Sequence, residues 1–141
     1  MSCTDLSFGT ITFGDMTETS VTVAVDPDTA EVTASGAASV SLSGGAPAEC
    51  TVTGSSAGSV QVFIDGAIVG GATSIIVPMA GSGPEQSLEA VAFALDGFNP
   101  VGVSGGTASF FIGAEVAIPS GLTADDLGAY SGTMNVSVQE Q

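Results

Sequence analysis

The sequence contains no lysine, arginine or histidine, although 15 of its 141 residues are aspartate or glutamate. Without cationic side chains the chain cannot neutralise phosphate, so we expect neither nucleic-acid binding nor docking to an anionic membrane surface. Its carboxylates must instead face water, hydrogen-bond donors or dissolved cations. The net charge of −15 keeps copies of the chain apart at low salt and lets them approach when salt screens the charge.

The same absences remove most catalytic chemistry. Without histidine there is no Ser-His-Asp or Cys-His unit, and without lysine there is no Schiff base and no Walker-type phosphate site. Paired carboxylates are the main remaining option, but the acidic residues are spread along the chain rather than grouped. The sequence therefore predicts a protein that is not an enzyme, with no catalytic residues and no cofactor.

The length and composition fit a single domain, residues 1–141, that can bury its own core. Twenty glycines and six prolines separate short runs in which apolar and small polar residues alternate, such as residues 21–25 and 59–64. Alternating runs at intervals of roughly ten residues predict an all-β fold, an immunoglobulin-like or pilin-like antiparallel β-sandwich.

One segment, residues 84–95, fits two structures. As a helix it has Ser82 as a cap and apolar residues at helical spacing. As a strand it places Val91, Phe93 and Leu95 on one face and alanines on the other. We favour the strand because the surrounding runs are all β.

The two cysteines, Cys3 and Cys50, are a candidate disulfide if the protein is secreted; the alternative is two buried free thiols. Closing a loop of that size would stabilise the fold by about 4 kcal/mol in the chain-entropy model. Two cysteines without histidine make a poor zinc site.

The stretch "DPDTAE" places Asp26, Asp28 and Glu31 close together. Oxygen ligands at this spacing could form a calcium loop, but the full pattern of a known calcium motif is missing. A proline between two aspartates is more often a plain turn. We therefore predict a turn and assign no metal ligands, with Ca²⁺ as the weaker alternative.

The stretch "GAYSGTMNVSVQEQ", residues 128–141, predicts a turn followed by one strand. Met134, Val136 and Val138 would lie on one face of this strand, with Asn135 and Ser137 on the other. A strand at the border of a sheet is either a liability or a means of assembly.

Several segments in order resemble a bacterial family of domains of unknown function found in secreted proteins. The resemblance covers nearly the whole chain and is carried by "LSFGTI", "VTVAVDPDTAEVTASG", "AECTVTG", "GGTASFFIGAEVAIPSG" and "GAYSGTMNVSV". The family is distantly similar to chaperone–usher fimbrial subunits and spore coat protein U domains. The resemblance implies an immunoglobulin-like sandwich, export from the cell, a structural role and an export chaperone as a candidate partner.

Three features depart from the fimbrial pattern. The chain ends in "VQEQ" without the usual penultimate tyrosine, only "MSCTD" precedes Leu6, and the cysteines are not in the usual place. If the fimbrial pattern holds, the last strand borders an open groove. Either the first segment closes this groove, or the last strand swaps into a neighbour, or a neighbour supplies a strand.

We therefore predict a secreted subunit that assembles with copies of itself into a fimbria-like filament or a surface coat. Phe8, Met134, Val136 and Val138 are the candidate assembly residues. The alternatives are a calcium-dependent surface-binding module and a virus capsid-decorating protein.

Overall fold

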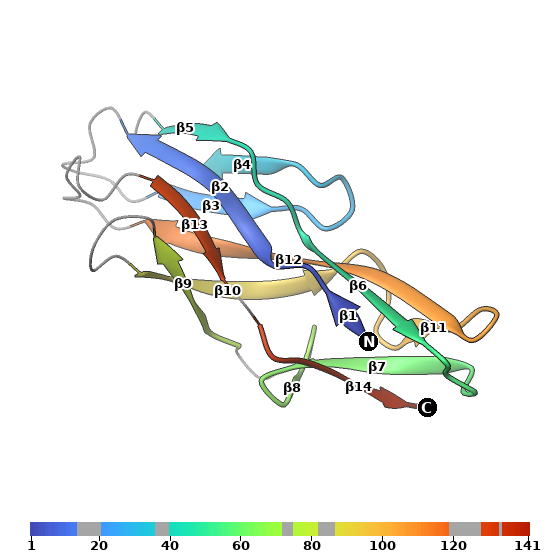
Figure 1. The fold of residues 1–141 in the computed structure, drawn as a ribbon. Helices are drawn as coiled ribbons and strands as arrows, with labels where there is room; N and C mark the ends of the chain where they lie inside the picture. Colours follow the sequence, from blue (N-terminus) through green and yellow to red (C-terminus); the bar gives the residue numbers. More distant parts are fainter. Residues whose placement is uncertain (14–20, 36–39, 72–74, 82–86, 119–127, 133) are drawn as a thin grey trace.

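The computed structural model describes residues 1–13, 21–35, 40–71, 75–81, 87–118, 128–132 and 134–141. Throughout these residues the regular structure consists of antiparallel β-strands in two sheets (Figure 1). The prediction of an all-β, sandwich-like antiparallel fold is confirmed. In the described part of the chain no helix is long and apolar enough to cross a membrane.

The larger sheet has ten strands and the smaller sheet has four. The larger sheet follows the order β1-β6-β12-β10-β9-β13-β2-β5, with β3 on β12 and β4 on β3. The smaller sheet follows the order β11-β7-β14, with β8 also on β7. The strands of the larger sheet are β1 (Ser2–Cys3), β2 (Leu6–Phe13), β3 (Val21–Val25), β4 (Val32–Ser35), β5 (Val40–Ser43), β6 (Ala48–Thr53), β9 (Val77–Gly81), β10 (Ser87–Leu95), β12 (Thr107–Ile118) and β13 (Gly128–Gly132). Those of the smaller sheet are β7 (Ser59–Ile64), β8 (Ala67–Ile68), β11 (Val101–Gly102) and β14 (Val136–Glu140).

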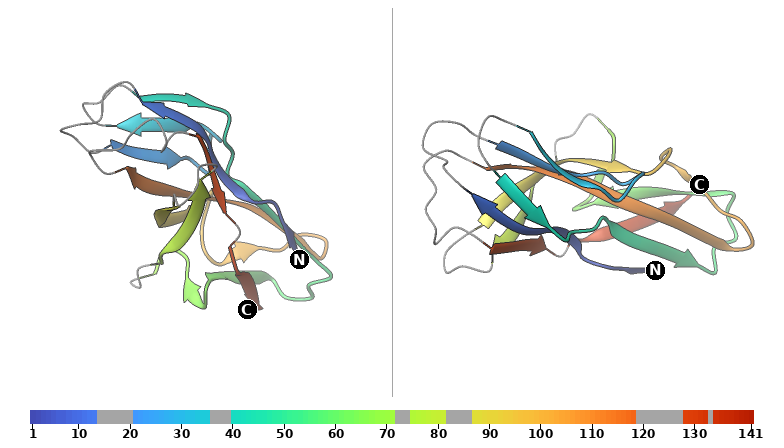
Figure 2. Two further views of the ribbon diagram at one scale, coloured as in Figure 1. Left: turned by 60° about the vertical axis from the view of Figure 1, so that its left-hand side comes forward. Right: turned by 90° about the horizontal axis from the view of Figure 1, so that it is seen from above.

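The long strand β12 organises the larger sheet. On one side its residues 107–112 pair with β6 and its residues 114–118 pair with β3, while β10 pairs along the other side. Gly113 stands at the changeover, where a Cβ atom would overlap the carbonyl oxygen of Val25 and lie 2.6 Å from Cδ of Pro27. Only glycine lets β3 approach this closely, so the larger sheet can divide here and curl until β4 contacts β5 (Figures 1 and 2).

The curled sheet and the smaller sheet share one apolar core. Strand β7 shows how the sequence builds it, because Val60, Val62 and Ile64 are fully buried while the residues between them are half-buried. Strand β6 presents Ala48, Cys50 and Val52 with the same period of two. The largest fully buried side chains are Phe8, Phe110, Leu6, Ile11, Ile64, Ile112, Ile118, Val21, Val23 and Val60.

The structure resolves one ambiguity of the sequence and corrects one prediction. Residues 87–95 form β10, so the strand that we favoured is confirmed there; residues 84–86 lie outside the described part. Residues 128–132, for which the sequence predicts a turn, are strand β13, paired with both β2 and β9. The prediction was wrong because pairing on both sides overrides the low strand propensity of glycine.

Candidate functional site: the open side of the sandwich

The sandwich has two lateral sides, which are closed differently. Residues 96–100 cross from β10 in the larger sheet to β11 in the smaller sheet and cover one side. On the other side, β1 ends the larger sheet and β14 ends the smaller sheet. We call the region between β1 and β14 the open side. The two chain termini lie at this end of the molecule in Figures 1 and 2.

Strand β14 pairs with β7 through alternate residues. The N–H of Asp65 donates to the carbonyl of Asn135 (3.0 Å), and the N–H of Gln141 donates to the carbonyl of Ser59 (3.0 Å). Both pairs belong to one antiparallel register. In such a ladder every second residue bonds to the partner strand, and the residues between them turn their main-chain groups away.

The outward-turned residues of β14 are Val136, Val138 and Glu140. In the part of the chain that the structure describes, no strand pairs with β14 on this side. The carbonyl of Glu140 accepts a long bond from the side chain of Gln141 (3.4 Å). The remaining main-chain groups form a ready border for another strand.

The side chains of β14 follow the alternation that the sequence predicts. Met134, Val136 and Val138 are half-buried against the core, whereas Asn135 and Ser137 are exposed. This apolar face is therefore only partly covered by the rest of the chain.

Strand β1 shows the same incomplete cover. Cys3 lies directly opposite Cys50 of β6, with the Cα atoms 4.1 Å apart, and the two form a disulfide. Opposite residues of a ladder share one face of the sheet, so Cys3 lies on the inner face together with Cys50. Cys50 is fully buried but Cys3 is exposed, so the facing sheet does not extend over β1.

The predicted disulfide is confirmed, and the alternative of two free thiols is wrong. A disulfide indicates an oxidising, extracytoplasmic location. Apart from it, the first segment is held by few contacts. The N–H of Thr4 donates to the carbonyl of Glu49 (2.9 Å), and the N–H of Glu49 donates to Oγ1 of Thr4 (2.8 Å). Residues 1–5 are all exposed. This first segment therefore pairs with β6 but does not cover the open side.

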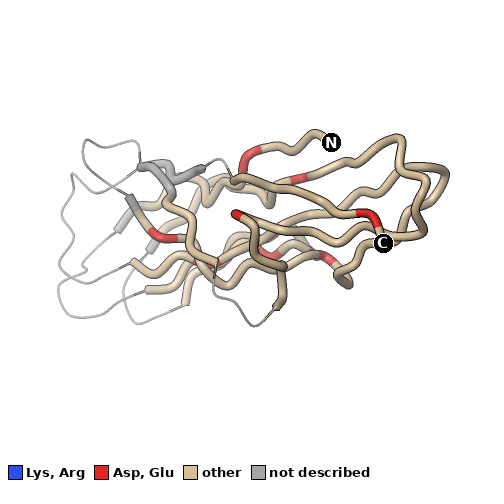
Figure 3. Tube along the Cα trace, turned by 90° about the horizontal axis from the view of Figure 1, so that it is seen from below, with Lys and Arg blue, Asp and Glu red and all other residues tan. Residues whose placement is uncertain are grey.

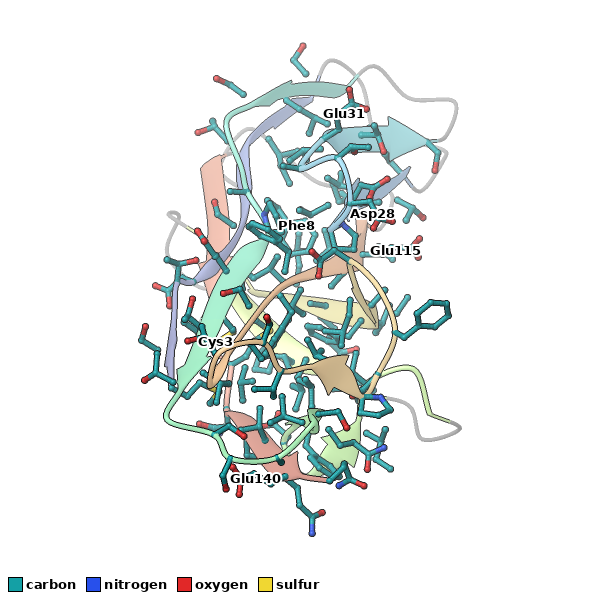
Figure 4. The ribbon with its side chains drawn as sticks, turned by 90° about the vertical axis from the view of Figure 1, so that its right-hand side faces the viewer. Cys3, Phe8, Asp28, Glu31, Glu115 and Glu140 are labelled. Carbon is teal, nitrogen blue, oxygen red and sulfur yellow. A yellow bond between two sulfur atoms is a disulfide. The ribbon has the colours of Figure 1, made fainter. Side chains whose placement is uncertain are left out.

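Glu140 fastens the end of β14 to the loop between β6 and β7. Its Oε1 accepts hydrogen bonds from Oγ of Ser55 (2.6 Å) and from the N–H of Ser56 (3.2 Å). These bonds, with that from Ser55 the stronger influence, favour the carboxylate and hold the pKa of Glu140 below its usual range. Figure 4 shows Cys3 and Glu140 on the same side of the molecule.

The opposite side is closed by a residue that the sequence did not single out. Oδ1 of Asn99 accepts from the N–H of Val62 (2.9 Å), and its Nδ2 donates to the carbonyls of Val62 (3.0 Å) and Val69 (2.9 Å). Asn99 thus fills the edge of β7 between β11 and β8. In the sequence "NP" predicts only a turn, and the strand that Asn99 meets lies far away along the chain.

The acidic residues are scattered along the trace, with no lysine or arginine among them (Figure 3).

The predicted turn at Asp26 is confirmed: its Oδ1 accepts from the N–H groups of Asp28 (2.8 Å) and Thr29 (3.3 Å). The N–H of Asp26 donates to the carbonyl of Glu31 (2.9 Å). Among the residues with described positions, no three metal-ligating side chains come together.

The structure brings together three of the four candidate assembly residues. Met134, Val136 and Val138 follow one another along the open side. Phe8 lies instead in β2 and is fully buried within its own chain. Its contribution to a core shared between copies stays a prediction.

The fold and the disulfide together indicate an extracytoplasmic β-sandwich domain, and within its described residues the outer edge of β14 has no partner strand. Over residues 1–139 the sequence matches the family described as a domain of unknown function, DUF4402, and the chain belongs to this family. Comparison with curated proteins and with solved structures gave no match. The resemblance to a domain family of unknown function is therefore confirmed, and the distant similarity to fimbrial subunits stays a prediction.

Proposed function

We propose that this protein is a secreted, non-enzymatic building block that assembles with copies of itself into a filament or a surface coat. The observation that carries the proposal is the free edge of β14. Its main-chain groups face outward at Val136 and Val138 while the side chains of these residues are only half-buried. An export chaperone that covers this edge before assembly would be a second partner.

A strand added beside β14 would both pair with its free edge and cover the exposed inner face of the open side. Its main chain would bond to the outward groups of Val136 and Val138, and its alternate side chains would cover the inner face near Cys3. Strand addition of this kind takes affinity from main-chain hydrogen bonds and specificity from the alternate side chains. It also removes the exposed edge that monomeric sandwiches must otherwise protect.

Charge sets the conditions for assembly. Every copy carries a net charge of −15 and no cationic side chain, so two copies repel each other at low ionic strength. At about 0.15 M salt the Debye length is only about 8 Å, and short-range pairing can compete with repulsion. We expect light scattering to rise with added NaCl or CaCl₂ and negative-stain microscopy to show extended assemblies. Monomers at every salt and calcium concentration would refute the proposal.

A substitution at Val138 tests the edge itself. Val138→Pro removes an N–H that is not bonded to β7, so the fold should persist while an added strand loses a hydrogen bond and meets the proline ring. Val138→Ile keeps the N–H and the apolar side chain and is the matched control. We expect assembly to be abolished by proline and retained by isoleucine, with circular dichroism confirming that both variants fold.

A further inference from the structure

Phe98 is the most exposed large apolar side chain in the described part of the chain. It is 92% exposed, compared with 53% for Ile76, 52% for Met1 and 39% for Ile68. An isolated exposed apolar residue needs no explanation, but the way in which the fold presents Phe98 does.

Hydrogen bonds fix the chain on both sides of Phe98. Before it, Oδ1 of Asp96 accepts from the N–H of Phe111 (2.8 Å), and the N–H of Asp96 donates to the carbonyl of Phe111 (3.2 Å). After it, the side chain of Asn99 makes its three bonds to the edge of β7 and to Val69. The ring is thus presented to solvent by a braced segment. Presenting an aromatic ring in this way lowers the entropy that binding would otherwise lose.

The surroundings of Phe98 carry little charge in a strongly acidic chain. The sequence has no Asp or Glu in residues 97–114 and none in residues 66–84. These two stretches meet at the edge of β7, where β8, Asn99 and β11 follow one another.

We call the exposed residues Ile68, Phe98 and Pro100 the Phe98 surface. A hollow of about 240 Å³ adjoins it, lined by Asp96, Gly97, Phe98, Pro100, Val101, Gly102, Ser109 and Phe110.

The Phe98 surface and the open side lie at opposite borders of the smaller sheet. The order β11-β7-β14 places β11, which follows Phe98, at one border and β14 at the other. At the β11 border, Gly102 also turns its main-chain groups outward, because Val103 and its register partner Gly58 form the bonded pair. One border therefore projects an uncharged aromatic residue, and the other has a half-covered apolar face.

We propose that the Phe98 surface of one copy docks on the open side of the next copy. This inference rests on the proposed function and names the surface that the neighbour contributes. Phe98 would cover the half-buried faces of Val136 and Val138, with Gly102 beside the free edge of β14. The Phe98 surface has no charged residue of its own, so it brings no further carboxylate to the open side, where Glu140 lies, and the electrostatic cost of this contact between two acidic copies is low. Because the two surfaces differ, each added copy leaves one of each free, and the assembly grows as an open chain unless the rotation between copies closes it into a ring.

Complementation between variants tests this pairing. Phe98→Ala loses the Phe98 surface but keeps the open side, whereas Val138→Pro loses the open side but keeps the Phe98 surface. At a protein concentration just sufficient for the unmodified chain to assemble in high salt, we expect each variant alone to stay monomeric and an equimolar mixture to form heterodimers that do not elongate, as measured by analytical ultracentrifugation. Phe98→Ala should raise the concentration at which assembly begins by about tenfold or more, because it removes a large buried apolar area.

A photoreactive benzoylphenylalanine at position 98 locates the contact directly. We expect cross-links from one copy to residues 134–140 of another, identified by mass spectrometry, and few cross-links to that segment from the same probe at position 76. Unchanged assembly of Phe98→Ala, failure of the mixture to form heterodimers, or cross-links elsewhere would each overturn the docking inference. If the docking inference fails but Val138→Pro still blocks assembly, the proposed function stands. If the unmodified chain never assembles, the docking inference and the proposed function are both wrong.

Discussion

The two lateral sides of the sandwich are finished by different means. On the side of residues 96–100, the side chain of Asn99 hydrogen-bonds to the N–H and carbonyl of the fully buried Val62 in β7. It also bonds to the carbonyl of Val69, which follows β8. On the open side, one disulfide holds β1 and one carboxylate fastens the end of β14, while no strand among the described residues pairs with the outer edge of β14. One side is therefore closed by side chains of the chain itself, whereas the other is held in place and leaves a strand edge available for another copy.

The largest effect should follow from breaking the covalent hold on the open side. Replacing Cys3 and Cys50 together by alanine releases a loop with a sequence separation of 47. We expect the free energy of unfolding to fall by about 4 kcal/mol, because the unfolded chain regains the entropy of that loop. Urea denaturation measures this change, and hydrogen exchange should show early loss of protection at residues 1–5.

Reduction of the unmodified protein provides the control for this double variant. Dithiothreitol should produce a similar loss in the unmodified protein and none in the variant. A variant within about 1 kcal/mol of the unmodified protein, a difference typical of a single ordinary substitution, would show that β1 is held by its non-covalent contacts.

A smaller loss should follow on the closed side from Asn99→Ala. The substitution leaves the N–H of the buried Val62 and the carbonyl of Val69 without their partner, while the carbonyl of Val62 keeps its bond from the N–H of Val69 (3.2 Å). We therefore expect a loss of about 2–3 kcal/mol in urea denaturation. Asn135→Ala is the matched control on the open side, because it removes one exposed bond to Asp65 (3.1 Å). It should cost less than about 0.5 kcal/mol. Equal losses from the two variants would contradict the contrast between the sides.

The smallest effect concerns Glu140 and depends on pH. Its pKa is lowered in the folded protein, so its stabilising contribution is present above the ordinary pKa of glutamate. That contribution is lost as the pH falls through the lowered value. Acid should therefore loosen the end of β14, seen as a lower protection factor at the N–H of Gln141 once the exchange rate is corrected for the intrinsic pH dependence of exchange. Glu140→Gln should remove this pH dependence, while Glu89→Gln, a change of equal charge on β10, should preserve it. Persistence of the dependence in Glu140→Gln would assign it to another group.

Much of the fold could be predicted from the sequence because apolar residues alternate with a period of two. Val60, Val62 and Ile64 are buried as this alternation requires, and so are the inner residues of β6. The apolar face of Met134, Val136 and Val138 was predicted in the same way. Residues 128–132 were not, because small residues favour a turn locally and become a strand only between β2 and β9.

For the candidate site, local pattern identified the face of the last strand but not its partners. Asn99 could not be predicted, because its bonds join positions up to 37 residues apart along the chain. The Phe98 surface could not be predicted either, since an aromatic residue near a proline in the sequence gives no sign of how exposed it is.

By itself the sequence determined the strand class, the acidic repulsion between copies and the presence of two cysteines able to pair. These follow from composition and from alternation along a single strand, which are local properties. Only the tertiary structure decided that Cys3 lies on an uncovered inner face, that β14 ends its sheet and that Phe98 projects at the opposite border. Those facts depend on which strands lie side by side, and that order is set by packing across the whole chain.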